Sequence, residues 1–277
     1  MTERCTAVIL TFNCAAIIGE TVAQARLAAD EVFVVDSFST DGTVERVREL
    51  GCTVVQRAFK HYADQRNWAI DQLADRGGWQ LHLDADEVLD DEAVGAIRRV
   101  LADAAPGRPE AWLLRRVDYF MGRRLRFSGV NPWHLRLFRS GLGRCEDRLY
   151  DQHFVSPVAA ARLPGCMHDR NHVTLADWTA RHNRWSDLEA QESARGGGGR
   201  GVLQGRLGGD PSERTRALKG LYYRLPGGWR ALAYFAYRYV LRLGFLDGRE
   251  GFYFAFLQAL WFRLLVDAKV YESRRGA

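Results

Sequence analysis

A regular alternation of short apolar runs and amphipathic segments fills the first hundred residues and constrains the fold most. Four apolar runs predict buried strands, at residues 5–12, 31–35, 52–56 and 79–83. Four segments with helical periodicity predict helices, at residues 17–29, 41–50, 61–74 and 90–104. Strands that alternate with helices form a parallel sheet flanked by helices. The sequence therefore predicts an α/β, Rossmann-like fold with a mostly parallel sheet, which binds ligands beyond the carboxyl ends of its strands.

The pattern changes after residue 109. Further strands are predicted at residues 111–117 and 154–163, on either side of an arginine- and aromatic-rich stretch at 119–138. A run with eight glycines at 196–210 predicts a mobile loop. Four helices are predicted around that loop, at residues 174–194, 212–224, 229–245 and 249–272. We expect one domain at 1–195 with halves 1–105 and 106–195, a flexible loop at 196–213, and a helical extension at 214–277.

The charge of the chain is distributed unevenly. Residues 214–277 carry 12 basic and 4 acidic side chains, whereas residues 1–213 carry 27 basic and 30 acidic ones. A basic tail indicates nucleic acid or an anionic membrane surface. No nucleic-acid motif is recognised, and the arginines of 229–243 alternate with large apolar residues, so we expect no nucleic-acid partner. That composition is typical of helices that lie in a membrane interface, or of helices packed on the sheet or on a second subunit.

The sequence also bears on the compartment. Five cysteines are scattered without a C-x-x-C pair, which indicates neither a disulfide framework nor a zinc site. The first residues lack the pattern of a secretory signal. The longest apolar stretch, 251–262, ends at Arg263 and is shorter than the roughly 18 residues that a spanning helix needs. We expect a cytoplasmic protein, peripheral on the inner face of the membrane if it is attached at all.

Polar side chains follow three of the predicted parallel strands. Thr11 and Asn13 follow the first, Asp36 ends the second, and Asp84 and Asp86 follow the fourth. A carboxylate at the end of a buried strand is costly unless it is paired, and a nucleobase edge or a ribose hydroxyl would pair with Asp36. A D-x-D pair suits a diphosphate bridged through Mg²⁺ or Mn²⁺. The alternative for the D-x-D acids is a capping role at the helix that starts near residue 90.

Several motifs in this order and spacing resemble the family-2 glycosyltransferases of the GT-A fold. They read VILTFN, VVDSFSTDGT, QRNWAI and LHLDADE. The segments RLFRSGLGRCEDRLYDQH and FLDGREGFYFAFLQALWFRLLVDAKVYE extend the resemblance over most of the chain. Within the family, the chain is most similar to the bacterial branch that adds sugars to lipopolysaccharide core and exopolysaccharide.

The resemblance implies a role for each matching residue on the donor side. Thr11, Asn13 and Asp36 would hold the nucleoside of a nucleotide sugar, for which a UDP-sugar is favoured. Gln65, Arg66 and Asn67 would lie near the base or the diphosphate, although Gln65 and Asn67 also suit an ordinary helix surface. Asp84 would face the ribose or the donor sugar, and Asp86 would bind the Mg²⁺ or Mn²⁺ ion that bridges the diphosphate.

The reaction that the resemblance implies is an inverting transfer to a hydroxyl of a cell-surface glycan, a lipid-linked glycan or a specialised metabolite. It needs a general base in the second half of the catalytic domain. Asp151 is favoured, then Asp147, with Glu146 as a further candidate; each also suits a salt bridge to Arg144 or Arg148. Many related enzymes have V-H-E where this chain has Tyr-Asp-Gln at 150–152, so the identity of the base stays open.

Other interpretations remain open. A polyprenyl-phosphate glycosyl synthase would need no strong base, and a non-enzymatic membrane- or nucleic-acid-binding protein would use only the tail. Trp133 and His134 either line an acceptor pocket or pack within a loop. His168 or His172 would contact the diphosphate or complete the metal shell, whereas a zinc pair is not expected. A homo-oligomer is compatible with the helical tail.

Overall fold

The computed structural model of the protein describes residues 3–103, 105–130, 132–170, 173–194, 205, 208 and 211–275. They form two compact units. The first unit comprises Met1–Arg116, Pro132–Glu146 and Gln152–Asp169. The second comprises Val117–Asn131, Asp147–Asp151 and Arg170–Ala277. Each unit combines separate stretches of the chain, so the units do not correspond to a single boundary in the sequence. The expected domain boundary at residue 195 stays a prediction.

The first unit contains the alternating elements that the sequence predicts. They are β1 (Cys5–Thr11), α1 (Ile18–Ala28), β2 (Glu31–Asp36), α2 (Thr43–Glu49), β3 (Thr53–Gln56), α3 (Tyr62–Gln72), a 3₁₀ turn (Ala74–Arg76), β4 (Trp79–Asp84), β5 (Glu87–Leu89) and α4 (Asp91–Ala102). They continue with β6 (Ala111–Phe120), β8 (Trp133–Arg139), β9 (Arg144–Cys145), β10 (Phe154–Val155) and β11 (Ala161–Asp169). The last residues of β6 belong to the second unit.

The main sheet is mixed, which corrects the expectation of a mostly parallel sheet. Its strand order is β3-β2-β1-β4-β8-β6-β11-β5, with β7 (Arg123–Arg124) paired to β6. The four strands from β3 to β4 are parallel. β8 pairs antiparallel with both β4 and β6, and β5 pairs antiparallel with β11. The α/β alternation ends at residue 104, so the strands after it are not restricted to parallel pairing.

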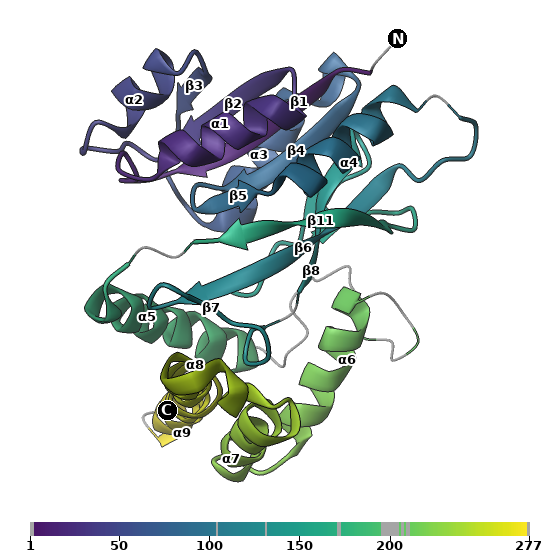
Figure 1. Ribbon diagram of the computed structural model, residues 1–277. Helices are drawn as coiled ribbons and strands as arrows, with labels where there is room; N and C mark the ends of the chain where they lie inside the picture. The colour runs from purple at the N-terminus through teal and green to yellow at the C-terminus, as the bar shows by residue number, and fades with distance from the viewer. Residues whose placement is uncertain are drawn as a thin grey trace. The chain divides into compact units, whose positions relative to one another are not determined.

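The period of two along β1 explains the layers in Figure 1. Cys5, Ala7 and Ile9 are buried on one face of the sheet, in a core shared with α1, α2 and α4. Val8 points to the opposite face, where it packs with Phe33 of β2 and with Ala69 and Leu73 at α3. A strand buried on both faces reads as a continuous apolar run, as CTAVILT does. The predicted sandwich of helices around the parallel half is confirmed.

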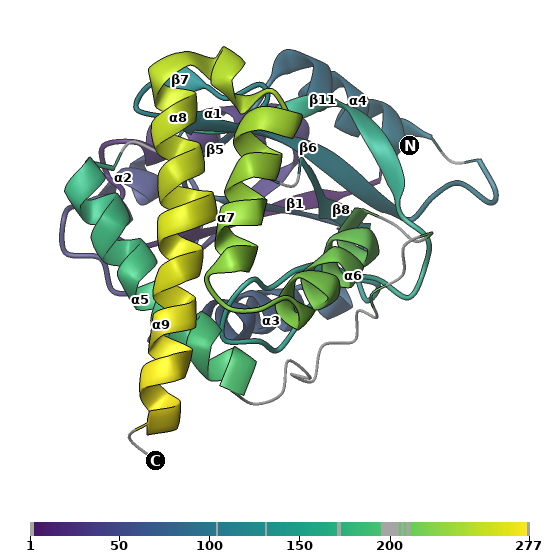
Figure 2. The same ribbon diagram turned by 90° about the horizontal axis from the view of Figure 1, so that it is seen from below.

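The second unit is mainly helical. Its elements are β7, α5 (Leu175–Ala194), α6 (Pro211–Arg224), α7 (Trp229–Ala236), a π-helical turn (Tyr237–Leu241), a 3₁₀ turn (Gly244–Asp247), α8 (Gly248–Ala255), a second π-helical turn (Phe256–Trp261) and α9 (Phe262–Arg275). α9 packs on α5, and α7 lies beside the long C-terminal helix, as Figure 2 shows. The predicted loop at 196–213 lies almost wholly outside the described residues.

The C-terminal helix corrects one expectation about the membrane. Gly244–Arg275, 32 residues, is long and apolar enough to cross a bilayer by length and composition alone, and 33% of its most apolar window is buried. The sequence-based limit at Arg263 was therefore too strict. A core helix of a soluble protein passes the same test, so this finding does not establish a spanning segment.

A buried carboxylate of the C-terminal helix fastens the loop before β8. Asp247 accepts hydrogen bonds from the backbone amides of Arg126, Phe127 and Ser128, at 2.7–2.9 Å, and from the Ser128 hydroxyl. Burial raises the pKa of Asp247, but these hydrogen bonds outweigh burial and lower it. Gly251 lets α8 approach this point, because a Cβ there would lie 2.5 Å from the Asp247 Cβ.

Candidate active site

The register of the parallel strands brings two candidate carboxylates to one edge of the sheet. Thr11 of β1 is paired with Asp36 of β2, and the preceding residue, Leu10, is paired with Asp84 of β4. β1 is the central strand of the three. Asp36 and Asp84 therefore flank the end of β1 on its two sides, at the edge where sheets of this kind bind ligands.

Asp36 is completely buried and is held within the chain. Its oxygens accept hydrogen bonds from the Thr11 hydroxyl at 2.9 Å, from the amide and hydroxyl of Ser39 at 2.9 and 2.5 Å, and from the Gln56 amide group at 3.2 Å. The carboxylate is thus already paired within the chain. A nucleobase edge or a ribose hydroxyl is not needed to pair with it, contrary to the expectation from the sequence. Asp36 holds together the ends of three strands and the loop that follows β2.

Asn13 connects the loop after β1 to the loop after β2. Its backbone amide donates to the Ser39 hydroxyl, and its side-chain oxygen accepts from the Thr40 amide, both at 2.9 Å. Asn13 has a positive φ of 47°, a conformation that asparagine tolerates well. The neighbouring rings of Phe12 and Phe38 are 62% and 54% exposed. Two aromatic faces are therefore available to a ligand beside these two loops.

Asp84 lies between two arginines. Its Oδ1 accepts from Arg66 at 2.6 Å, and its Oδ2 lies 3.2 Å from Arg136. Burial raises the pKa of Asp84, but both guanidiniums outweigh burial and hold it well below its usual range. The Arg66 guanidinium also lies 5.0 Å from the centre of the Phe154 ring. The side chain of Asp84 is therefore ionised, and its orientation is fixed.

Glu87 of β5 shares Arg136 with Asp84 but has the opposite electrostatic character. Its Oε1 lies 2.5 Å from Arg136, and its Oε2 accepts from the Asp84 backbone amide at 2.9 Å. Complete burial, assisted by the charge of Asp84, raises the pKa of Glu87 to about 7 against the attraction of Arg136. Arg136 and Glu87 are buried, and together with the partly exposed Asp84 they form one network that holds the D-x-D segment.

Asp86 is the residue expected to bind a divalent cation. It is half-buried and follows β4 directly. Among the described residues, no group of three or more His, Cys, Asp or Glu side chains is arranged to hold a metal. Mg²⁺ is commonly bound by one or two carboxylates together with substrate phosphates. The carboxylate of Asp86 is therefore suited to an ion that is shared with a diphosphate. The described side chains do not form a complete metal site without a substrate.

Gln65 and Asn67 are held inside the protein. Gln65 is buried, accepts from Arg57 at 2.6 Å and donates to the Ser37 hydroxyl at 3.3 Å. The side chain of Asn67 makes two hydrogen bonds, of 2.8 and 2.9 Å, to the backbone of Cys145. Both residues brace neighbouring loops in this structure, and only Arg66 of the QRN segment reaches the D-x-D carboxylates.

The three candidate bases differ in their surroundings. Glu146 belongs to the first unit, is buried, and accepts from the His153 backbone amide at 3.3 Å. Asp147 belongs to the second unit and is exposed. Asp151, also in the second unit, has a positive φ of 57° and accepts from the Lys219 ammonium group at 3.1 Å.

Lys219 joins Asp151 to a second acid, Glu189 of α5, at 2.8 Å. Although burial lowers the pKa of Lys219, these two carboxylates outweigh burial and raise it above its usual value. The ammonium group stays charged, so α6 holds the carboxylate of Asp151 through an ion pair that is largely withdrawn from water.

The remaining candidates have local partners. The Arg162 guanidinium lies 4.7 Å from the centre of the Trp133 ring, and the rings of His134 and His153 are stacked at 6.3 Å. His168 lies 3.6 Å from Asp90, the residue that caps α4. The helix cap therefore comes from Asp90 and not from the D-x-D acids. His172 lies outside the described residues.

Arg136, Glu87 and Phe38 belong to the site but are not predicted from the sequence. Arg136 lies in a stretch that contains several arginines, and only its burial and its two carboxylate partners distinguish it. Glu87 belongs to the LHLDADE motif, so its position beside the D-x-D pair was the one available signal. Phe38 lies in the loop after β2 with a positive φ of 60°, and its ring is exposed.

The fold and this edge define the class of protein. The mannosyltransferase PcManGT from Pyrobaculum calidifontis, solved in complex with GDP-Man and Mn²⁺, shares the fold with a TM-score of 0.54. The match has 16% sequence identity and covers 99% of this chain and 88% of that chain. The protein has the GT-A fold, with a C-terminal helical extension.

Residues 6–154 match the family of glycosyl transferase family 2. This match spans more than half of the chain, and the protein belongs to that family of enzymes. The matched region contains both flanking carboxylates of the sheet edge and the D-x-D segment. The resemblance carried by the sequence motifs is confirmed.

Curated relatives agree with this assignment. An uncharacterized glycosyltransferase of Rickettsia bellii is 35% identical over 156 residues, which are 56% of this chain and 49% of that protein. The chain thus spans about half the length of such Rickettsia relatives. The lipopolysaccharide core biosynthesis glycosyltransferase LpsC of Rhizobium meliloti is 28% identical over 202 residues, 69% of this chain and 72% of that protein.

Proposed function

We propose that the protein transfers a sugar, with inversion at the anomeric carbon, from a nucleoside-diphosphate donor to a hydroxyl of a cell-surface glycan. The observation that supports this most is the register of β1, which leaves Asp36 and Asp84 on either side of one strand end. Family membership supports sugar transfer, and the exposed rings of Phe12 and Phe38 supply a surface on which a nucleobase would stack.

The donor would meet groups of different chemistry along this edge. Asn13 and the loops that Asp36 organises would contact the nucleoside. Asp84, ionised and held by two arginines, offers its half-exposed carboxylate to hydroxyl groups of the ribose or the sugar. Arg66 supplies positive charge on the same side as the diphosphate would lie. A UDP-sugar is our preferred donor, and PcManGT, which was solved with GDP-Man, makes a GDP-sugar the first alternative.

Asp86 would hold Mg²⁺ or Mn²⁺ jointly with the diphosphate oxygens. The ion supplies a Lewis acid that stabilises the negative charge of the departing nucleoside diphosphate. The protein's own part is to keep Asp86 available in the correct place. The Arg136 network does this by fixing Asp84 and Glu87 on both sides of Asp86.

The general base would take the proton of the acceptor hydroxyl. Asp151 remains the first candidate, Asp147 the second and Glu146 the third. The Lys219 ion pair places the Asp151 carboxylate beside a positive charge and restricts the rotation of the side chain. LpsC is named for lipopolysaccharide core biosynthesis, which supports a lipid-linked or cell-surface glycan as the acceptor.

The donor and metal assignments can be tested together by thermal shift. UDP-, GDP-, dTDP- and CMP-sugars are added with Mn²⁺ or with EDTA, and one donor should raise the melting temperature only when the metal is present. Asp86→Asn should remove that metal-dependent shift, whereas Asp75→Asn, at an exposed acid beyond α3, should keep it. An equal shift in EDTA would reject the metal assignment, and no shift with any donor would reject the proposed function.

A polyprenyl-phosphate glycosyl synthase is the alternative, and the candidate bases distinguish it. A phosphate acceptor needs no strong base, so Asp151→Asn and Asp147→Asn would then leave turnover largely intact. For a hydroxyl acceptor, loss of the base should lower kcat by about a hundredfold or more. Hydrolysis of the donor serves as the control that the variants still bind it.

A further inference from the structure

The second unit exposes many large apolar side chains. Of the 24 large apolar side chains that are exposed among the described residues, 14 lie between residues 218 and 256. Trp229 is 74% exposed and Leu241 is 75% exposed. A large number of exposed apolar side chains in one part of a protein indicates an interaction surface.

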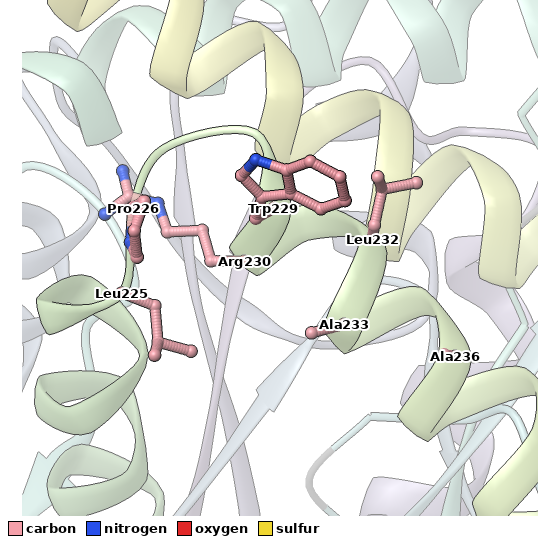
Figure 3. Close-up of a pocket in the computed structure, with 7 residues that line it drawn as sticks. All are labelled: Leu225, Pro226, Trp229, Arg230, Leu232, Ala233 and Ala236. Carbon is pink, nitrogen blue, oxygen red and sulfur yellow. The ribbon is translucent and has the colours of Figure 1, made fainter.

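The helical period of α7 gathers several of them on one side. Trp229, Leu232, Ala236 and Val240 follow one another at spacings of three or four residues. With Leu225 at the end of α6, the first three line an open hollow of about 470 Å³, shown in Figure 3, whose surface is almost entirely apolar. We call this surface, from Leu225 to Leu241, the α7 face.

The exposed charges of residues 211–256 have one sign. Between residues 211 and 256 the sequence has eight basic and three acidic side chains. Arg214, Arg224 and Arg249 are exposed, and no acid of this range is exposed among the described residues. Asp247 is buried against Ser128, and Glu250 is paired with Arg123 at 3.3 Å. Asp267 of α9 is largely buried and neutralises Arg230, which lines the hollow, so neither of these two adds an exposed charge.

We propose that the α7 face docks on a lipid bilayer that contains anionic phospholipid. Large apolar and aromatic side chains flanked by arginines match the interface of such a bilayer, where rings enter the acyl boundary and guanidinium groups meet phosphates. Pairing of two copies through this face would bring positive charge against positive charge. The charge of the surface therefore favours a membrane over a second copy of the chain.

The docking also bears on the acceptor. α6, whose last turn borders the α7 face, carries Lys219, which holds Asp151 at 3.1 Å and Glu189 at 2.8 Å. The helix that meets the bilayer thus also holds the candidate base. This step rests on the proposed function: the acceptor is a glycan carried by a lipid, and not a soluble metabolite.

Flotation with vesicles tests the docking. The full-length protein should float with vesicles of equal parts phosphatidylcholine and phosphatidylglycerol. The double variant Trp229→Glu, Leu232→Glu should bind them at least about tenfold more weakly, because it loses buried apolar area and gains charge repulsion. The matched double variant Leu27→Glu, Leu175→Glu changes two exposed leucines elsewhere by the same charge and should bind as the parent does.

A second variant guards against misfolding and tests the charge. Arg224→Gln with Arg249→Gln should weaken binding to the mixed vesicles about tenfold or more and leave binding to phosphatidylcholine vesicles unchanged. Failure of the parent to float, or equal binding by all variants, overturns the proposal. A parent that dimerises without lipid through Trp229 and Leu232, and does not float, overturns it in favour of self-association.

Donor binding separates this inference from the proposed function. The Trp229→Glu, Leu232→Glu variant should keep the parent's metal-dependent thermal shift with the nucleotide sugar identified above. Its transfer of labelled sugar to the lipid extract of bacterial membranes should fall at least about tenfold, in line with the loss of vesicle binding. Undiminished transfer by the variant overturns the link between docking and transfer, and a parent that shows the thermal shift but labels nothing in the extract overturns the lipid-linked acceptor. A parent without any thermal shift rejects only the proposed function.

Discussion

Two carboxyl groups three residues apart have opposite pKa shifts in this site. Two arginines hold the pKa of Asp84 low, whereas burial raises the pKa of Glu87 to about 7. Both side chains share Arg136. The segment therefore keeps one fixed negative charge for a ligand and one carboxyl that changes its charge near neutral pH.

The pKa of Glu87 makes a prediction about stability. Its folded value of about 7 lies above the ordinary 4.5, so the folded protein binds more protons than the unfolded chain between these pH values. The contribution of Glu87 is therefore complete below about pH 4.5 and is lost as the pH rises through 7. The glutamine in Glu87→Gln does not titrate. Between about pH 5 and about pH 8, the free energy of unfolding of this variant should therefore rise by on the order of 1–3 kcal/mol relative to that of the parent.

Urea denaturation of both proteins at the two pH values measures this difference. Glu45→Gln, at an exposed position of α2, provides the control and should show no such change. His82 is buried and its pKa is lowered by burial and by both arginines, so its own titration affects parent and variant alike. A difference between Glu87→Gln and the parent that is independent of pH would contradict the raised pKa.

At the residue scale, sequence reasoning found the acids but not their partners. Asp36, Asp84 and Arg66 were identified from motifs, and they lie at the sheet edge. The fully satisfied state of Asp36 and the role of Arg136 depend on residues that are distant along the chain. Local sequence patterns do not show which distant residues contact each other. The order of the strands in the sheet does show this.

At the scale of single elements, Gly251 and Gly220 offer a matched pair of substitutions. A Cβ at Gly251 would lie 2.6 Å from the Gly244 carbonyl oxygen, so Gly251→Ala should destabilise the protein by about 1–3 kcal/mol. A Cβ at Gly220 in α6 meets nothing within 4 Å, so Gly220→Ala should stabilise by about 0.5–1 kcal/mol. Thermal unfolding measures both, and equal effects of the same sign would refute the close approach at Asp247.

Elements were predictable where their signal was local. β1, β2 and β4 are predicted from apolar runs, and α4 and α5 from helical periodicity. The cap of α4 is Asp90 and not one of the D-x-D acids. β5 was missed because it has three residues and pairs with β11, almost eighty residues later. The π-helical turns inside the last two predicted helices interrupt the 3.6-residue period without a proline or glycine to mark them.

At the scale of the whole molecule, the second unit depends on its C-terminal helices. Deletion of residues 229–277 would remove Phe254, which packs in one cluster with Phe120, Leu125 and Trp178. It would also remove Asp247 from the amides of residues 126–128. The shortened protein should melt at a lower temperature and bind a hydrophobic dye such as ANS, and an unchanged melting curve without dye binding would contradict this dependence.

The composition of the second unit has a consequence for the ancestry of such enzymes. Its residues come from three stretches, Val117–Asn131, Asp147–Asp151 and Arg170–Ala277, with parts of the first unit between them. A single recombination event within the gene cannot replace such a unit as a block. A new C-terminal stretch would therefore have to keep the contacts that Asp247 and Phe254 make with residues 117–131.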